Sequence, residues 1–479
     1  MPGHRWLAHA FRIGTALCVA SDVTACTSFS IDAGMGAVNA IVAPELKADA
    51  VKISADQNAA QARARTQKLL KSPLSVQSAV RVALLNNKGL QAAYNELGIA
   101  EAVMVEASLP PNPRFSLSSI STPIELDVER RIVADILALA TLPTRAQIAA
   151  DRFRQAQLRA AEETLRIAVE TRRSYYEAVA AVQLVASLEQ AASAAEASAK
   201  LANQLSETGA MNKLDQARED AFYADLVTQL GTARQRATRM RERFVRAMGV
   251  SNDDLNFRLP HALPALPQRP PALRAVEVEA IRRRVDLQIA RIELGALAKS
   301  YGLTNATRFV NLIEVSGISR TQHEASGASG SGGGAEVDIQ VPIFDFGEVR
   351  VRQAGETYMQ ALNRLAEKAV NVRSEAREAY QAYRTSYAIA DHYRRTVLPL
   401  RKTISDETTL RYGAMQIDVF SLLTEAQRRI TANMAAIEAQ RDFWLAATNL
   451  DAAIVGGGSV ESDGASRPVS RPADSATSE

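Results

Sequence analysis

The sequence has little of what a disulfide-stabilised or compact β-rich protein needs. Its 479 residues include only two cysteines, Cys18 and Cys26, and aromatic residues make up only 5% of the chain. Glycine and proline are sparse outside a few clusters, which favours long helices over compact sandwiches. The sequence also has no run of 18 uninterrupted apolar residues, so the body of the chain carries no transmembrane-helix signal.

Charge of one sign and catalytic constellations are absent as well. The formal net charge is only +3 and no basic block with interleaved aromatic residues occurs, so we expect no nucleic-acid partner. His261, His323 and His392 lie far apart without ligand spacing, and we interpret them as surface residues. The glycine-rich run 327–334 lacks the Lys-Ser/Thr ending of a phosphate loop and is expected to be a mobile loop between strands. The sequence therefore predicts no enzyme activity, no cofactor and no metal site.

The N-terminal segment is similar to a secretory signal. Arg5 and Arg12 precede a short apolar stretch at 13–20, and the sequence VTAC follows at 23–26. Small residues before a cysteine resemble the processing box of bacterial lipoproteins, which predicts cleavage before Cys26 and lipid attachment at that residue. The alternative is an ordinary signal peptide with a chance cysteine. In both cases the mature chain keeps at most one cysteine and cannot form an internal disulfide.

The strongest positive feature is an internal repeat. Residues 90–98 read LQAAYNELG and residues 287–295 read LQIARIELG, so six of nine positions are identical. A second pair consists of GAM at 209–211 followed by Asp215, and GAM at 413–415 followed by Asp418. A duplication with this period predicts an architecture built from two related halves.

Apolar residues at alternating steps of three and four predict two very long helices, at about 145–206 and 348–407. Coiled-coil seams run through 158–186 in the first and 362–383 in the second. At ~1.5 Å per residue, helices of this length cannot fold back into a globule. Shorter helices that could complete a bundle are expected at 74–108, 213–249, 274–302 and 416–454.

Apolar and charged residues alternate in two further segments, 126–140 and 335–343. Period-two alternation is what a membrane β-strand needs, because one face meets lipid and the other meets water. Their expected partners, 114–121 and 307–318, alternate less clearly. The sequence therefore predicts four strands in each chain.

Four strands cannot close a membrane barrel, since single-chain barrels need at least about eight. An open sheet in lipid would leave backbone groups unpaired, so the chain is expected to oligomerise. Two copies would give a barrel filled by its own side chains, whereas three would give twelve strands around an open lumen. The predicted fold is therefore mainly α, with two repeats, an α-barrel of long coiled-coil helices and a trimeric twelve-stranded β-barrel.

These features divide the chain into six parts. They are a signal peptide at 1–25, an N-terminal arm at 26–72, a first repeat at 73–250, a Pro-rich link at 251–272, a second repeat at 273–455 and a disordered tail at 456–479.

The segment VPIFDFG at 341–347 resembles a motif of the TolC-like outer-membrane efflux family, in which the last strand passes into the long helix. Asn112-Pro113 and Tyr412-Gly413 are also similar to that family, and the resemblance covers about 73–455. It implies a trimeric channel in the outer membrane of a Gram-negative bacterium, with an α-barrel that extends into the periplasm. Pro342, Phe344 and Gly347 then mark the strand-to-helix transition, whereas LPTR at 142–145 lacks the corresponding glycine in the first half.

The same resemblance places the two GAM turns at the periplasmic tip, which narrows the channel and meets an adaptor protein. Asp418 corresponds to the first of two acidic residues that constrict the aperture, and Ser421 stands at the second position. The remaining expected tip residues are Gly209, Asp215, Tyr412 and Gly413. For both aspartates the alternative is a solvated carboxylate stabilised by the helix dipole.

The function that this resemblance implies is a passive exit duct for small molecules or metal ions. The homotrimer would work with a periplasmic adaptor and an inner-membrane pump, as part of a tripartite efflux system. One alternative is the exit duct of a type I protein secretion system, and another is a lipid-tethered periplasmic coiled-coil scaffold. The alternating strands favour a channel, because a scaffold would not need lipid-facing segments.

Overall fold

The computed structural model describes residues 29–53, 56–269 and 275–458. Cys26, the expected signal peptide and almost all of the expected tail lie outside these residues. The chain divides into two compact units. The sheet unit contains 94–157 and 290–363 together with residues near the N-terminus, and the helical unit contains most of the remaining chain.

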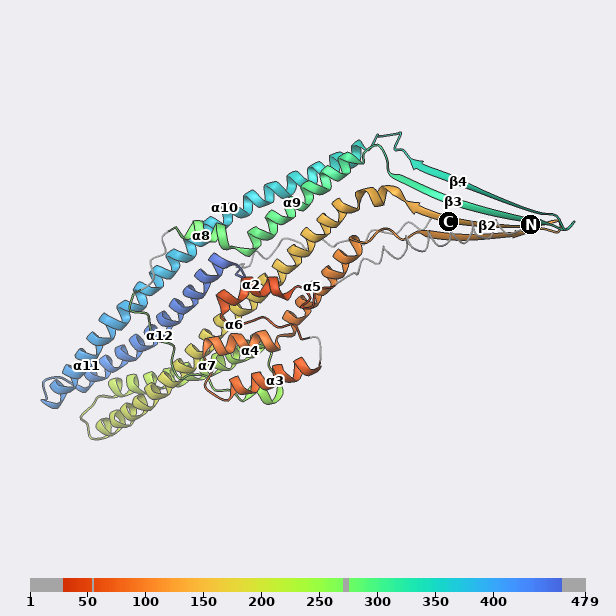
Figure 1. Ribbon diagram of the computed structural model, residues 1–479. Helices are drawn as coiled ribbons and strands as arrows, with labels where there is room; N and C mark the ends of the chain where they lie inside the picture. The colour runs from red at the N-terminus through yellow and green to blue at the C-terminus, as the bar shows by residue number, and fades with distance from the viewer. Residues whose placement is uncertain (1–28, 54–55, 270–274, 459–479) are drawn as a thin grey trace. The chain divides into compact units, whose positions relative to one another are not determined.

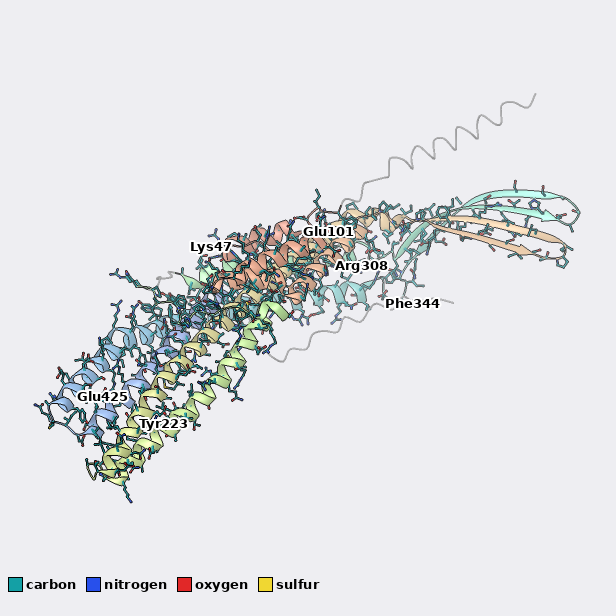
Figure 2. The ribbon with its side chains drawn as sticks, turned by 90° about the horizontal axis from the view of Figure 1, so that it is seen from below. Lys47, Glu101, Tyr223, Arg308, Phe344 and Glu425 are labelled. Carbon is teal, nitrogen blue, oxygen red and sulfur yellow. The ribbon has the colours of Figure 1, made fainter. Side chains whose placement is uncertain are left out.

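The sheet unit is built around four antiparallel strands in the order β1-β2-β3-β4 (Figure 1). The strands are β1 (Arg114–Ser121), β2 (Glu125–Asp135), β3 (Leu312–Glu324) and β4 (Ser329–Gln340). Since β2 pairs with β3, the sheet joins the two sequence repeats through backbone hydrogen bonds. Arg308 precedes β3 and Phe344 follows β4 at the same end of the sheet (Figure 2).

Three of the four expected strands have other bounds in the structure, and β3 lies at Leu312–Glu324 and not at 307–318. The segment 136–140 is helical, because the Asp135 carboxylate accepts a hydrogen bond from the Ala138 N–H at 2.8 Å and starts the helix there. The expected loop at 327–334 is largely strand, since β4 includes Gly330 to Gly334. Pairing with β3 satisfies the inward-facing backbone groups of these glycines, and this pairing outweighs their low intrinsic preference for strands.

The helices are long where the periodic pattern is long. Those that contribute to both units are α2 (Met35–Leu46), α5 (Lys88–Ala107), α6 (Ile136–Glu207), α9 (Val285–Ala306) and α10 (Glu348–His392). Those of the helical unit are α3 (Asp56–Leu70), α4 (Val76–Asn86), α7 (Lys213–Met248), α8 (Val276–Arg283), α11 (Leu398–Gly413) and α12 (Val419–Val455), with a short 3₁₀ turn η1 (Asn252–Leu255). By length and composition, part of α6 could cross a membrane, and 44% of that window is buried inside the chain.

The helices expected at 74–108 and 274–302 are each interrupted. Asn87 and Arg284 separate α4 from α5 and α8 from α9, and both have extended backbones with ψ of 113° and 121°. The first interruption lies against Gly249, where a Cβ would be 2.7 Å from the Asn87 Cα, so only glycine fits at that position. Each interruption lies three residues before the repeated segment begins, so the duplication extends to the shape of the chain.

The second long helix is also not continuous. Between α10 and α11 the chain forms one π-helical turn, η2 (Tyr393–Val397). Pro399 lies at the start of α11 and has no backbone N–H to donate to the preceding turn. The wider turn accommodates this proline inside an otherwise regular helix.

An aromatic core holds the middle of the helical unit together. Tyr176 of α6 stacks on Trp444 of α12 with ring centroids 5.3 Å apart, and Tyr175 donates a hydrogen bond to the Leu74 carbonyl at 2.9 Å. Burial raises the pKa of both tyrosines to about 12. The Trp444 indole N–H donates to the Pro264 carbonyl at 2.9 Å, which fixes the Pro-rich link against this core.

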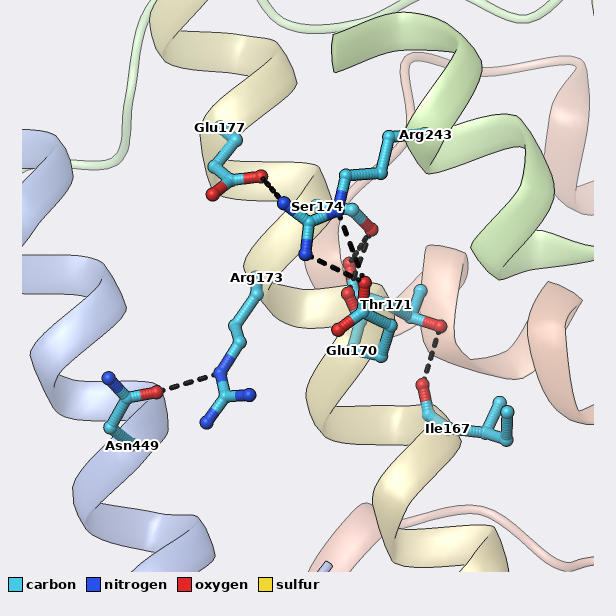
Figure 3. Close-up of polar contacts among 8 residues, drawn as sticks. All are labelled: Ile167, Glu170, Thr171, Arg173, Ser174, Glu177, Arg243 and Asn449. Carbon is cyan, nitrogen blue, oxygen red and sulfur yellow. Dashed lines mark hydrogen bonds and ion pairs between the residues drawn. The ribbon is translucent and has the colours of Figure 1, made fainter. Parts of the chain in front are cut away.

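Polar contacts add to the packing around α6 (Figure 3). Arg243 of α7 lies between Glu170 and Glu177, at 3.1 and 3.2 Å. Arg173 of α6 reaches the second repeat, where its Nε donates to the Asn449 side chain of α12 at 2.7 Å. These contacts connect α6 to the return helices of both repeats.

Candidate functional site

The sheet has one apolar face, which the described residues leave largely uncovered. The register places Phe115 beside Ile132 and Val315 beside Val337, so their side chains share a face. Phe115, Ile132 and Val337 are 72%, 52% and 59% exposed. The apolar members of this face are Phe115, Leu117, Leu126, Val128, Ile132, Ala134, Ile313, Val315, Ala335, Val337 and Ile339. The same register also places Arg130, Ser119, Ser121, Ser319, Thr321, His323, Ser329 and Ser331 on it, and Arg130 is its one charged member.

The opposite face is charged and cross-linked by ion pairs. Arg131 of β2 contacts Glu336 of β4 at 2.8 Å, and Arg114 pairs with Glu314. Arg320 of β3 pairs with Asp127 of β2. Its charged members are Arg114, Glu125, Asp127, Glu129, Arg131, Asp135, Glu314, Arg320, Glu324, Glu336 and Asp338, and Ile120, Val133, Leu312 and Ile318 lie on the same face. The sheet therefore has the alternation that the sequence predicted.

The edges of the sheet are open. Within the described residues, β1 pairs only with β2 and β4 pairs only with β3, so each has a row of unpaired N–H and C=O groups. In lipid, each unpaired group would cost several kcal/mol. An apolar face can therefore enter a bilayer only if both edges find further strands.

The transition from β4 to α10 requires glycine at Gly347. Phe346 and Gly347 both take left-handed backbones, with φ of 47° and 72°, and the Phe346 N–H donates to the Pro342 carbonyl at 2.8 Å. A Cβ at Gly347 would lie 2.1 Å from the Arg308 carbonyl oxygen. Phe344 points away from this turn and is 97% exposed. The first half needs no such turn, because α6 begins directly after β2 and includes Pro143.

The first interhelical turn joins α6 to α7. Gly209 ends α6 with φ of 77°, and the Ala210 N–H donates to the Leu205 carbonyl at 2.8 Å. The Asn212 side chain then caps α7 by accepting a hydrogen bond from the Asp215 N–H at 2.9 Å. Asp215 also forms an ion pair with Arg218 at 2.9 Å. The charge of Asp215 is therefore compensated locally.

The second turn joins α11 to α12. Tyr412 and Gly413 belong to the last turn of α11, and Met415 takes the left-handed backbone with φ of 55°. Asp418 caps α12 by accepting a hydrogen bond from the Ser421 N–H at 2.8 Å. Hydrogen bonds from Ser421 lower the pKa of Asp418 below its usual value. Asp418 is fully ionised at neutral pH and has no cationic partner among the described residues.

The geometry pairs the two turns differently from the sequence motif. The left-handed residue is Gly209 in one turn and Met415 in the other, and the helix cap is Asn212 in one and Asp418 in the other. Asp215 therefore corresponds to Ser421 and not to Asp418. Aligning the two GAM sequences therefore pairs residues that are two positions out of structural register. The helix caps and the left-handed residues give the correct pairing, because they define where each helix ends.

Sequence reasoning missed two buried carboxylates behind these turns. Glu219 of α7 and Glu425 of α12 are only 3% and 6% exposed. Glu219 lies four residues after Asp215, and Glu425 lies four residues after Ser421. Glu425 has a counter-charge in Arg401 of α11 at 3.2 Å. No ion pair to Glu219 occurs in the part of the chain that the structure describes, and burial raises its pKa. An acidic residue inside the contact face of a helix hairpin is the signal that could have found them.

The three histidines lie apart and are all exposed, as the sequence indicated. Across the described ranges, no group of three or more His, Cys, Asp or Glu residues could hold a metal ion.

No protein-family model and no curated protein matches the chain by sequence. Among solved structures, the CmeC outer membrane channel of Campylobacter jejuni has a TM-score of 0.68 at 15% identity, over 80% of this chain and 86% of that one. The MtrE outer membrane channel of Neisseria gonorrhoeae has a TM-score of 0.65 at 15% identity, over 82% and 89%.

The outer membrane protein VceC of Vibrio cholerae is similar as well, with a TM-score of 0.64 at 14% identity over 83% of this chain and 96% of that one. At these identities the likeness concerns the fold. The chain has the fold of TolC-like outer-membrane channels, as the sequence resemblance implied.

Proposed function

We propose that this protein is the outer-membrane channel of a tripartite efflux system and serves as a passive exit duct. The observation that supports this most is the open sheet, with an apolar face, a charged face and two unpaired edges. Three copies joined edge to edge would form a twelve-stranded barrel, with the charged face around water and the apolar face toward lipid. The channels of similar fold support the same assignment.

The interhelical turns are the proposed periplasmic tip. In three copies, Asp418 would form a ring of three uncompensated carboxylates, whereas the charge of Asp215 is balanced by Arg218. A periplasmic adaptor and an inner-membrane pump are the proposed partners at this end. Small molecules or metal ions are the proposed cargo.

Two alternatives remain to be separated by experiment. The exit duct of a type I protein secretion system would have the same fold. A deletion strain that becomes sensitive to small toxic compounds but still secretes its proteins would support efflux, and the reverse result would support secretion. A periplasmic scaffold is disfavoured, because it has no use for an exposed apolar sheet face.

The assembly is tested by mass. Purified in detergent, the protein is expected to have close to three times the chain mass of 51.7 kDa by light scattering, corrected for bound detergent. The same preparation should conduct ions in planar bilayers. A monodisperse, non-conducting monomer would rule out the channel, because the edges of one sheet cannot close on each other in lipid.

The proposed lipid anchor is tested separately. If Cys26 is lipidated, Cys26→Ser should abolish incorporation of labelled fatty acid while channel conductance persists. Unchanged labelling would refute the anchor and would leave the channel proposal intact.

A further inference from the structure

Exposed phenylalanines gather at one end of the sheet. Phe115 is the second residue of β1, Phe309 precedes β3, and Phe344 and Phe346 follow β4. They are 72%, 54%, 97% and 55% exposed. The turns at the other end, 122–124 and 325–328, contain no Phe, Tyr or Trp. Among the described residues, exposed aromatic side chains therefore border the sheet only at the end where the strands meet the helices.

Two arginines without carboxylate partners lie beside these rings. The Arg308 guanidinium is 4.6 Å from the centroid of the Phe309 ring, and its Nε is buried without a hydrogen-bond partner in the described structure. Arg350 donates to the Arg308 carbonyl at 3.3 Å, and no ion pair of either arginine occurs among the described residues. By contrast, the arginines of the charged face, Arg114, Arg131 and Arg320, each contact a carboxylate.

We propose that this aromatic and arginine rim (Phe115, Phe309, Phe344, Phe346, Arg308 and Arg350) binds the headgroup layer of anionic phospholipids. Aromatic residues border the lipid-facing bands of membrane barrels at the depth of the headgroups. Arginine can form two parallel hydrogen bonds with one phosphate, and neither Arg308 nor Arg350 is neutralised by a carboxylate among the described residues. Arginine at a lipid surface contributes about 1 kcal/mol, or roughly five-fold in affinity.

The rim rests on the proposed function, since the sheet must lie in a bilayer. The proposed rim adds anionic phospholipid as a partner and states which leaflet of the bilayer the rim would contact. The helix-proximal leaflet would be the one whose lipid phosphates contact the protein. A second copy of the chain is the competing occupant of Phe344, but a purely protein contact would not account for two cations without carboxylates next to the exposed rings.

The depth of the rim is tested with Phe344→Trp in the full-length protein, reconstituted in phospholipid bilayers with spin-labelled lipids. The introduced indole is expected to be quenched more strongly by a label near the headgroup than by one deep in the acyl chain. Phe420→Trp is the matched control, because Phe420 is a partly exposed phenylalanine at the start of α12, far along the chain from the sheet. Its signal should respond to neither label. If Phe344→Trp also responds to neither, protein covers the rim and the proposal is wrong.

The phosphate contact is tested with Arg308→Gln/Arg350→Gln. Native mass spectrometry of the trimer should show phosphatidylglycerol retained by the wild type and reduced by about ten-fold or more in the double variant. Arg130→Gln is the control, since Arg130 is also free of carboxylates but lies within the strands and bonds to Thr321. Undiminished retention in the double variant would overturn the proposal. So would displacement of the lipid by millimolar inorganic phosphate, because that would indicate a free-anion site.

Trimer mass and conductance are measured on the same preparations. If the wild type fails to form a conducting trimer, the channel itself is refuted. If it forms and conducts but the rim variants behave like the wild type, only the lipid surface is refuted.

Discussion

The two buried glutamates occupy equivalent positions in the two hairpins, but only one of them has a counter-charge. Arg401 compensates Glu425 across the α11 and α12 hairpin. The corresponding residue of the first hairpin is Ala195, which offers no charge, while Asp215 and Asp220 add repulsion to the burial of Glu219. Ionised Glu219 therefore opposes folding, whereas the charge of Glu425 has a partner in Arg401.

This asymmetry predicts opposite effects of two matched substitutions. The pKa of Glu219 is raised in the fold, so its contribution to stability is full below the unfolded pKa and is lost as pH rises through the folded pKa. Glu219→Gln should therefore raise Tm by about 2 °C at pH 8 and change it little at pH 4. Glu425→Gln should lower Tm at pH 8, because it leaves Arg401 without a partner. Circular dichroism melting at both pH values measures this, and shifts of the same sign at pH 8 would contradict it.

Gly347 is the residue on which the strand-to-helix turn depends. Gly347→Ala should reduce the yield of folded trimer severalfold, since the left-handed backbone costs about 1–2 kcal/mol and the new methyl group meets the Arg308 carbonyl. Gly355→Ala is the control. Gly355 lies inside α10 and its added Cβ would make an ordinary 3.5 Å contact with Tyr301, so this variant should gain up to about 1 kcal/mol. Heat-modifiable gel migration of membrane extracts compares the two, and equal yields would refute the steric argument.

At the scale of elements, the helix caps determine how the tip can be tested. Asparagine caps a helix about as well as aspartate, and Asn212 already does so in the first turn. Asp418→Asn therefore removes the charge and keeps the cap, whereas alanine would remove both.

We expect Asp418→Asn to lower the cation selectivity of the channel in planar bilayers. Three carboxylates around a narrow aperture favour cations, and the difference should shrink in high salt because the Debye length falls from ~8 Å at physiological ionic strength. Asp215→Asn should change selectivity less, since Arg218 already compensates that charge. If Asp215→Asn alone altered selectivity and conductance, the constriction would belong to the first turn.

Elements whose signal is local were predictable from the sequence. The alternation in β2 and the seam of α6 are periodic over many residues, so both faces follow from the pattern alone. The break at Asn87 was not predictable from the local pattern, because Asn87 packs against Gly249 from a distant part of the chain. Glu219 and Glu425 escaped notice for the same reason, since neither burial nor a counter-charge is visible in one helix.

At the scale of the whole molecule, the duplication predicted the architecture but not its internal register. Leu90 and Leu287 are both buried, and a helix break precedes each at the same offset, so that pairing was correct. The pairing of the two GAM turns was out of structural register, because short identical sequences can recur at positions that are not structurally equivalent. The number of copies in the channel follows from barrel geometry and is a prediction about the assembly.

The glycines of β4 also affect the protein before it reaches a membrane. An exposed sheet edge attracts strands of other unfolded chains, and the first half of β4 has almost no side chains to favour such pairing. Before assembly, we expect the β4 edge to remain weakly ordered and to become ordered only when it pairs with the β1 edge of another copy. In the proposed outer-membrane channel, the composition of this one strand would thus delay its pairing with a neighbouring chain and would protect the exported precursor from premature aggregation.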